Sequence, residues 1–188
     1  VASVTLTSAG AAATAGVGAS PYSIVPTLAV GSGLSNYTIS YANGTLTVNQ
    51  KVLTVTADNK DRHYGNANPA FTPSYSGFEN DQTLATSDVA GSPELSTAAT
   101  TASPVGTYPI TIGLGTLSSV NYSFDLVDGT LTVDQRALLI TANSTSKTYG
   151  SAVTFAGTEF SAVGLVNGDG VASVTLTSAG AAATAGVG

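Results

Sequence analysis

The stretch NYSFDLVDGTLTVDQ, residues 121–135, carries the strongest fold signal in this chain. Its two runs alternate between apolar and polar residues, which is the period of a strand with one buried face. Asp128-Gly129 separates the runs, and this dipeptide is typical of the type I′ turn of a two-residue hairpin. We therefore predict a hairpin in which Leu131 and Val133 face the core while the neighbouring threonines face solvent.

The same stretch occurs in a second version, NYTISYANGTLTVNQ at residues 36–50, which lies 85 positions upstream. Another pair of segments has the same spacing: KVLTVTADNKDRHYG at residues 51–65 and RALLITANSTSKTYG at residues 136–150. The sequence VASVTLTSAGAAATAGVG occupies both residues 1–18 and residues 171–188, which are 170 positions apart. The chain is therefore built of repeats.

These offsets divide the chain into modules of 85 residues. We predict that residues 1–50 are the C-terminal part of one module, residues 51–135 a complete module, and residues 136–188 the N-terminal part of the next. The parent molecule is then an array in which two alternating modules recur every 170 residues. Three residues without Gly or Pro, Asn49–Lys51, join the last strand of one module to the first strand of the next. We therefore expect an extended rod of modules joined head to tail.

The composition allows a folded core and excludes several classes of protein. Apolar residues make up 43% of the chain and charged residues only 9%, well below the roughly 25% of ordinary soluble domains. The net charge of -6 opposes the phosphate contacts that dominate nucleic-acid affinity, so we expect no nucleic-acid partner. The chain has no Cys, which excludes disulfides and thiolate metal sites. No apolar run approaches the roughly 18 residues of a membrane span, so we expect a protein that does not span the membrane.

Further strands are predicted where residues are β-branched or alternate with a period of two. These strands are Val52–Thr56, Thr107–Ile112 and Ala137–Thr141. One helical turn is expected at Asn80–Ala85, because Asn80 or Asp81 could cap it. The predicted core consists of Leu131, Val133, Tyr122 and Ile110, with Leu46, Val48, Tyr37 and Ile24 as equivalents in the first module.

The residues that usually carry catalysis do not recur with the repeat. A nucleophilic triad needs a His beside a hydroxyl and a carboxylate, but the only His is His63, and its counterpart in the next module is Thr148. Acid and base hydrolysis of sugars needs paired carboxylates. The closest pairs are Glu79 with Asp81 and Asp125 with Asp128. Neither pair has an aromatic-lined motif beside it, so we predict that the protein is not an enzyme and assign no catalytic, cofactor-binding or metal-binding residues.

A bound calcium ion and a Lys–Asn isopeptide bond are two ways in which such a module could be stabilised internally. Calcium accepts carboxylate and carbonyl oxygens, which Asp58, Asn59 and Asp61, or Asn167 and Asp169, could supply. Their spacing does not resemble an EF-hand loop, so we expect turn and cap roles for them, and a structural calcium ion is the less favoured reading. An isopeptide bond between Lys and Asn would need a buried lysine. Lys51 lies at the start of a predicted strand, and Lys60 and Lys147 lie in polar segments. The isopeptide bond is therefore the less favoured alternative.

Tyrosines recur near strand positions of both modules. They are Tyr22, Tyr37, Tyr108 and Tyr122. Repeated aromatic residues of this kind usually belong to a core, and the alternative is a platform on which sugar rings stack. A sugar-binding array would expose these rings in every module, whereas a purely structural repeat would bury them.

Several motifs give the chain a family resemblance. TANSTSKTYG (residues 141–150) and TADNKDRHYG (residues 56–65) are equivalent, as are GLVNGD (residues 164–169) and GFEND (residues 77–81). PVGTYPI (residues 104–110) and the closing NYxxxxxxGTLTV complete the pattern. The chain resembles a tandem of MBG-type repeats, the YGX kind found in very large bacterial surface proteins. The resemblance implies small β-rich domains related to the β-grasp; periodicity alone leaves an immunoglobulin-like β-sandwich open.

These observations predict a mainly β protein whose function is mechanical. We expect a stalk or filament repeat of a large exported bacterial adhesin or of an extracellular matrix protein such as a biofilm component, at the bacterial cell surface. The alternative is a carbohydrate- or mucin-binding module that binds surface glycans through many weak sites. The expected partners are neighbouring repeats, head to tail and also laterally. Because the two end segments are parts of modules, we expect them to complement each other.

Overall fold

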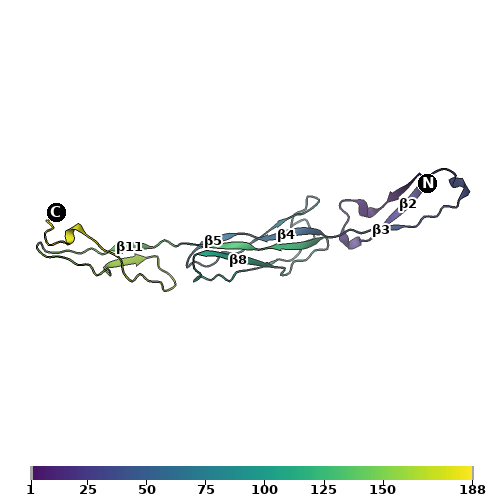
Figure 1. Cartoon of the computed structure of the whole chain (residues 1–188). Coiled ribbons are helices and arrows are strands. Elements are labelled where there is room, and N and C mark those ends of the chain that lie inside the picture. The colour runs from purple at the N-terminus through teal and green to yellow at the C-terminus, as the bar shows by residue number, and fades with distance from the viewer. Residues whose placement is uncertain (1, 188) are drawn as a thin grey trace. The chain divides into compact units, whose positions relative to one another are not determined.

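The structure, a computed structural model, describes residues 2–187 and is mainly β, with no α-helix in that range. Figure 1 shows the elements along the chain. The strands are β1 (Ser3–Thr7), β2 (Tyr22–Val30), β3 (Gly44–Leu46), β4 (Lys51–Ala57), β5 (Lys60–His63), β6 (Pro73–Ser76), β7 (Glu94–Ser96), β8 (Gly106–Gly113), β9 (Tyr122–Val127), β10 (Gly129–Asp134), β11 (Leu139–Ala142) and β12 (Phe160–Val163). Four 3-10 turns are η1 (Ala9–Ala11), η2 (Val17–Ala19), η3 (Leu34–Asn36) and η4 (Ala179–Ala181). Val1 and Gly188, the outer ends of the first and third predicted segments, lie outside the described residues.

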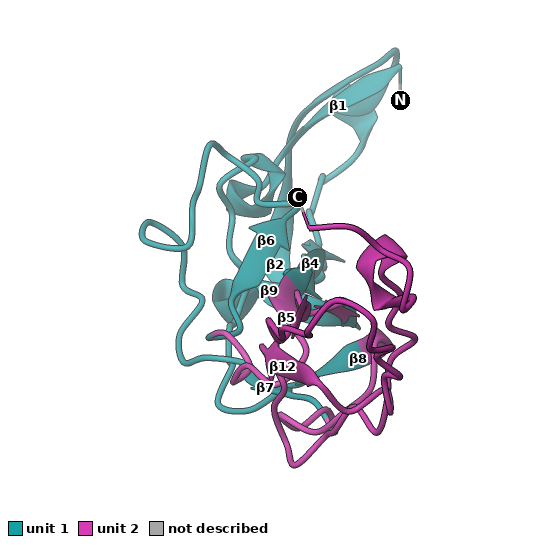
Figure 2. Ribbon diagram, turned by 90° about the vertical axis from the view of Figure 1, so that its left-hand side faces the viewer, with its two compact units in different colours: residues 1–60, 70–97, 109–131 teal, residues 61–69, 98–108, 132–188 magenta. Residues whose placement is uncertain are grey.

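The chain forms two compact units, coloured separately in Figure 2. Unit 1 consists of Val1–Lys60, Ala70–Thr97 and Pro109–Leu131. Unit 2 consists of Asp61–Pro69, Ala98–Tyr108 and Thr132–Gly188. The strands form four sheets, in the orders β1-β2-β3, β5-β10-β8-β7, β6-β4-β9 and β11-β12.

In unit 1, β4 is the central strand of the sheet β6-β4-β9. It pairs antiparallel with β6 and parallel with β9, from Lys51 opposite Tyr122 to Thr56 opposite Val127. A parallel pair cannot be joined by a tight turn, so β9 must come from a distant part of the chain. This strand pairing therefore links the start of the central module to its end.

The buried core of unit 1 lies against this sheet. Leu53 and Val55 of β4 are fully buried and pack with Val89, Leu117 and Tyr122. The rings of Phe78 and Tyr122 meet edge to face, with centroids 5.6 Å apart. All four core residues predicted for the central module are buried: Leu131, Val133, Tyr122 and Ile110. The predicted strands at residues 52–56, 107–112 and 122–127 are confirmed as β4, β8 and β9.

The predicted hairpin at residues 121–135 is wrong, because β9 and β10 belong to different sheets. Asp128 does not close a type I′ turn; its carboxylate accepts a hydrogen bond from the Ile112 amide at 3.0 Å. A Cβ at Gly129 would lie 2.3 Å from the Ala57 carbonyl oxygen, so glycine is needed for a close backbone approach. The dipeptide therefore leads the chain from one sheet to another instead of reversing it.

The predicted hairpin at residues 36–50 is also wrong, because residues 38–43 form no strand and β3 has another partner. β3 pairs antiparallel with β2, with Tyr22 opposite Leu46 and Ile24 opposite Gly44. The order β1-β2-β3 matches the order β7-β8-β10 within the four-stranded sheet. The first and central modules thus share a strand arrangement that differs from the hairpin their sequences suggested.

The first module differs from the central one in the exposure of its core equivalents. Tyr37 is 72% exposed, whereas its counterpart Tyr122 is 3% exposed. Residues 38–43 form no strand, although they correspond to most of β9. No strand equivalent to β4 precedes them among the described residues, so they lack the partner on which β9 forms. The prediction that Tyr37 is buried is therefore wrong; Ile24, Leu46 and Val48 are half-buried.

In unit 2, β11 and β12 repeat the pairing of β4 and β6. Leu139 lies opposite Val163 and Ala142 opposite Phe160, as Thr54 lies opposite Ser76 and Ala57 opposite Pro73. All four residues of β11 are exposed. The strand predicted at residues 137–141 begins two residues later than expected.

The helical turn predicted at Asn80–Ala85 is not present. Asn80 and Asp81 have φ values of 53° and 57°, in the left-handed region. Asn167, at the equivalent place, has a φ of 55°. Asparagine and aspartate tolerate this conformation better than most residues, so Asn80 and Asp81 form a tight turn instead of capping a helix.

We predict that Leu131→Ala lowers the free energy of unfolding by about 2 to 5 kcal/mol, because it leaves a cavity in a closed core. Leu46→Ala is the matched control, since the same side chain is only half-buried in the first module. Its effect should be less than half as large. Chemical denaturation measures both, and equal losses, or a loss below about 0.5 kcal/mol for Leu131→Ala, would contradict this core assignment.

Candidate functional site: the joints between modules

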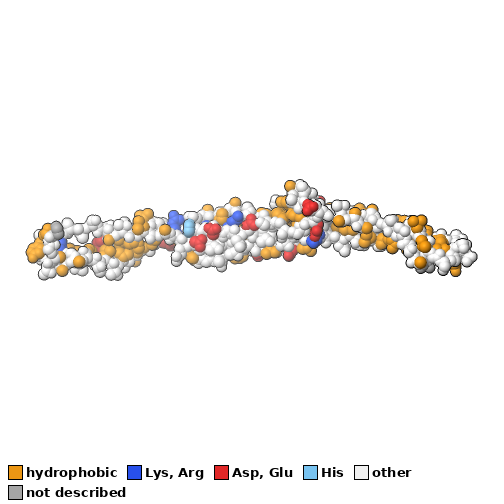
Figure 3. Space-filling model, turned by 90° about the horizontal axis from the view of Figure 1, so that it is seen from above, with side chains coloured by type: hydrophobic (Ala, Val, Ile, Leu, Met, Phe, Trp, Pro, Cys, Tyr) orange, Lys and Arg blue, Asp and Glu red, His pale blue; other side chains and the backbone are white. Residues whose placement is uncertain are grey.

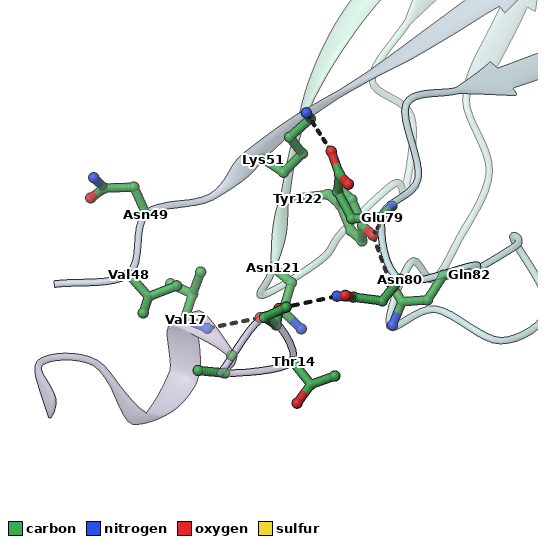
Figure 4. A pocket seen from close by; sticks show the side chains of 13 residues that line it. Thr14, Val17, Val48, Asn49, Lys51, Glu79, Asn80, Gln82, Asn121 and Tyr122 are labelled. Atoms are coloured by element: carbon green, nitrogen blue, oxygen red, sulfur yellow. Dashed lines mark hydrogen bonds and ion pairs between the residues drawn. The ribbon is translucent and has the colours of Figure 1, made fainter. Parts of the chain in front are cut away.

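The first joint lies within unit 1, where the chain passes from the first module into β4 (Figure 4). Residues 13–17 of the first module face residues 79, 80, 82, 121 and 122 of the central module across a small pocket. Val48 and Asn49 of the connection and Lys51 at the start of β4 line its edge. The two modules therefore contact each other at this joint in addition to being covalently connected.

Neutral amide groups make the hydrogen bonds of this joint. The Val17 amide donates to Asn121 Oδ1 at 2.8 Å, and Asn80 Nδ2 donates to the Ala13 carbonyl at 3.2 Å. Gln50 Nε2 donates to the Val120 carbonyl at 3.1 Å. Each bond of this kind contributes about 0.5 to 1.5 kcal/mol, and screening by salt affects neutral groups little.

The first module is suited to such contacts because it has no charged side chains. On the face drawn in Figure 3, most charged side chains gather on the central part of the chain, and residues 2–50 contain no Asp, Glu, Lys, Arg or His. This module therefore contributes only uncharged groups to the joint.

Two glycines allow the loop before β2 to lie close to Val120 and Asn121 of the central module. A Cβ at Gly16 would lie 3.1 Å from Asn121 Oδ1, and one at Gly18 would lie 3.3 Å from the Val120 side chain. The Tyr22 hydroxyl donates to the Gly16 carbonyl at 2.7 Å and fixes the loop. Small residues at these positions thus let the two backbones come close.

Asp88 holds the Asn121 side of the joint in place. Its carboxylate accepts hydrogen bonds from the Ser119 hydroxyl at 2.8 Å and from the amides of Val120 and Asn121 at 2.7 and 3.0 Å. Partial burial acts to raise the pKa of Asp88, but these hydrogen bonds outweigh it, so the pKa lies below the ordinary value of 3.8. The ionised carboxylate is therefore the form that fits this loop.

An ion pair lies beside the joint. Lys51 Nζ and Glu79 Oε1 are 2.5 Å apart, and both side chains are about half exposed. The hydrogen bond to Glu79, followed by the charge of that carboxylate, raises the pKa of Lys51. Because the pair is in contact with water, we expect it to contribute little to stability.

The second joint lies within unit 2 and uses equivalent residues. Asn167 Nδ2 donates to the Thr101 carbonyl at 3.0 Å, and these residues correspond to Asn80 and Ala13 of the first joint. Arg136, the counterpart of Lys51, donates to the Gly164 carbonyl and to Asn66 Oδ1, both at 3.0 Å. The same bond from asparagine to a loop carbonyl therefore occurs at both joints.

The glycine of the Tyr-Gly motif belongs to this second joint. Gly65 has a φ of 82°, and a Cβ there would lie 2.4 Å from the Val166 side chain. Val166 lines a pocket together with the apolar residues Val105, Leu138 and Leu165. The motif thus provides a left-handed turn with space for an apolar side chain of the next module.

A buried arginine supports the loop that carries Thr101. Arg62 is 5% exposed; its Nε donates to Asn68 Oδ1 at 2.7 Å and its Nη2 donates to the Thr100 carbonyl at 2.5 Å. Lys147, at the equivalent position, donates to the Ala182 carbonyl in the same way. Sequence reasoning missed this role, although a basic residue at both equivalent positions was a signal for it.

Three of the candidate catalytic residues make other contacts. His63 is exposed, with its Nδ1 3.0 Å from the Gln135 carbonyl oxygen. Glu79 pairs with Lys51, while Asp128 accepts from the Ile112 amide. The absence of enzymatic activity remains a prediction.

The candidate calcium ligands make contacts within the protein. Asp58 accepts hydrogen bonds from the hydroxyls of Thr72 and Ser74, and Asn59 Oδ1 accepts from the Thr130 amide at 2.8 Å. In residues 2–187, no three His, Cys, Asp or Glu side chains lie close enough together to hold a metal ion. A structural calcium ion therefore gains no support from this arrangement.

Tyrosine hydroxyls of both modules are engaged in internal hydrogen bonds. Tyr122 donates to Gln82 Oε1 at 2.6 Å, and Tyr108 donates to the Pro104 carbonyl at 2.8 Å. Tyr22 is half-buried and bonded to Gly16. Of the four recurring tyrosines, Tyr37 alone is exposed.

The comparison with known families agrees with this architecture. Residues 53–132 match the model of the MBG domain of the YGX type. This match confirms the resemblance of the central module to an MBG-type repeat, a domain that is found in surface proteins. Neither a curated protein nor a solved structure shows significant similarity to the chain. None of the helices in the described part of the chain has the length and apolar character needed to cross a membrane.

We predict that Asp88→Asn lowers the free energy of unfolding at pH 7, because the neutral amide accepts these hydrogen bonds less strongly. The native pKa is depressed, so the stabilisation by wild-type Asp88 is present above the ordinary carboxyl pKa and is lost as the pH falls through the lowered native value. The difference between the two proteins should therefore shrink in acid.

Denaturant titrations from pH 7 to pH 2 measure this difference. Asp125→Asn is the matched control, because it removes one negative charge from an exposed position of β9. A gap between wild type and Asp88→Asn that stays constant in acid would contradict the assigned role.

Proposed function

We propose that the chain is a structural repeat of a large exported bacterial surface protein, forming part of a stalk or filament in an adhesin or an extracellular matrix. The observation that carries this proposal is the recurrence of one hydrogen bond at both joints, from Asn80 to Ala13 and from Asn167 to Thr101. A repeated joint gives each module the same orientation to the one before it. An array of such modules extends in one direction.

The joints suit a load-bearing role at a cell surface. The short connection and the hydrogen bonds to Asn121, Asn80 and Gln50 restrict rotation between consecutive modules. Because the bonding groups are neutral, the joint should keep its geometry over a wide range of salt. In this proposal the β-grasp-like modules form an extended rod outside the cell, catalyse no reaction, and hold a terminal part of the protein away from the surface.

Carbohydrate or mucin binding by many weak sites is the second candidate. It would require exposed rings in each module, but Tyr122 is buried and the hydroxyls of Tyr22 and Tyr108 bond within their own modules. Tyr37 is the exposed member of the set, and its exposure follows from a missing strand partner. These contacts favour the structural role.

Small-angle X-ray scattering tests the proposal on tandem polypeptides of one, two and three 170-residue periods, in which residue 170 is followed by residue 1. A rod should show a radius of gyration that grows nearly in proportion to the number of periods. Compact folding would raise the value only about 1.3-fold on doubling the length, and this result would contradict the stalk.

The joint itself can be tested in the longest of these polypeptides. Asn80→Ala in every period should loosen the first joint and reduce the radius of gyration. Asn49→Ala is the control, because Figure 4 shows this asparagine at the same joint with its side chain pointing away from Asn80 and Asn121. Equal effects of the two changes would show that the hydrogen bond to Ala13 does not set the orientation.

A further inference from the structure

The same tight turn carries the asparagine of both joints. A backbone hydrogen bond closes each turn, at 3.1 Å over residues 79–82 and at 2.9 Å over residues 166–169. The central pair is Asn80-Asp81 in the first turn and Asn167-Gly168 in the second. All four of these residues have positive φ, as in type I′ turns. The two turns therefore have the same backbone form.

The residue after the asparagine is the main difference between the two turns. Both asparagines donate Nδ2 to a loop carbonyl, Asn80 at 3.2 Å and Asn167 at 3.0 Å. Asp81 and Gly168 are both exposed, so neither turn is shielded from water. Gly168 has no side chain, and a Cβ built there would meet no atom within 4 Å. The backbone amide that follows Asn167 is thus the more accessible of the two.

An asparagine followed by glycine can react with its own backbone. The amide nitrogen of the next residue loses its proton and attacks the asparagine Cγ, a C–N bond forms, and the side-chain nitrogen leaves as ammonia. Water then opens the resulting five-membered imide to aspartate or isoaspartate. A Cβ on the next residue restricts the backbone and hinders this attack. At Asp81 the carboxylate also opposes removal of the amide proton.

We propose that Asn167 is a site of spontaneous deamidation that opens the second joint, while Asn80 keeps the first joint intact. The product carries a carboxylate in place of the amide, and an ionised carboxylate only accepts hydrogen bonds. Its oxygen would face the Thr101 carbonyl, so the bond at 3.0 Å is lost and two acceptors repel each other. Opening of this joint then becomes irreversible.

The reaction and its consequence have different foundations. The reaction depends only on the turn and on the glycine, whereas its effect on the joint rests on the proposed function. In the proposed array, each 170-residue period has one joint that ages chemically and one that does not. The aged joints gain one negative charge each, which marks old material apart from new.

Peptide mapping by mass spectrometry, with detection of isoaspartate, tests the reaction in the full-length chain incubated at pH 6 and at pH 8. We expect modification of Asn167 to be at least about tenfold faster than that of Asn80, because glycine leaves the attacking amide open. The rate should be higher at pH 8, since the amide attacks after losing its proton. A synthetic peptide of residues 164–170 shows when the incubation is long enough. Mapping also separates the other Asn-Gly pair, Asn43-Gly44.

The two turns provide matched variants. Gly168→Asp gives the second turn the central pair of the first, and Asp81→Gly gives the first turn that of the second. Each new residue is one that the equivalent turn already holds. The double variant should move the reaction from Asn167 to Asn80. Equal rates at the two asparagines in the wild type, rates that ignore the exchange, or an unmodified Asn167 when the peptide has reacted would each overturn the proposal.

The effect on the joint is measured with Asn167→Asp, which reproduces one product, in every period of the three-period polypeptide. The radius of gyration should fall, as it should with Asn80→Ala. Ser161→Asp is the control, because it adds the same charge at an exposed position of β12. A radius that falls with Asn80→Ala but not with Asn167→Asp would keep the stalk and overturn the opening of the joint. Modification of Asn167 together with compact scattering of the unmodified polypeptide would keep the reaction and remove the stalk.

Discussion

The parallel pairing of β4 with β9 is the interaction on which the rest of the structure depends. It places the first strand of the central module beside a strand near the end of that module, so the core closes only after the intervening chain has folded back. Tyr122 at the start of β9 enters the core, and Asn121 just before it reaches the joint. The same pairing thus sets both the stability of the module and its connection to the preceding one.

The parts of the chain without this pairing show what it contributes. Tyr37 and the exposed residues of β11 have the sequences of core positions but lack the partner strand that would cover them. The joints, by contrast, are made from loops and amide side chains that do not need a complete module on both sides. Repetition of Asn80 as Asn167 therefore preserves the joint even where the core is open.

Much of the fold could be predicted from the sequence, because strand periodicity and repeats are local signals. The strands β4, β8 and β9 and the buried positions of the central module followed from alternation. The pairing of the strands could not be predicted in this way. Asp128-Gly129 has the composition of a hairpin turn, but in the structure it connects strands of two different sheets. The joints and the buried Arg62 were missed because their hydrogen bonds join residues far apart in the chain.

Amide hydrogen exchange on a dilute, monomeric sample tests the central claim most directly. If β9 is stabilised by its pairing with β4, amides of residues 122–127 should exchange at rates set by global unfolding, whereas amides of the equivalent residues 37–42 should exchange close to the rate of an unfolded chain. Equal protection of the two segments in the monomer would contradict the account, because the β9-type strand would then form without its parallel partner.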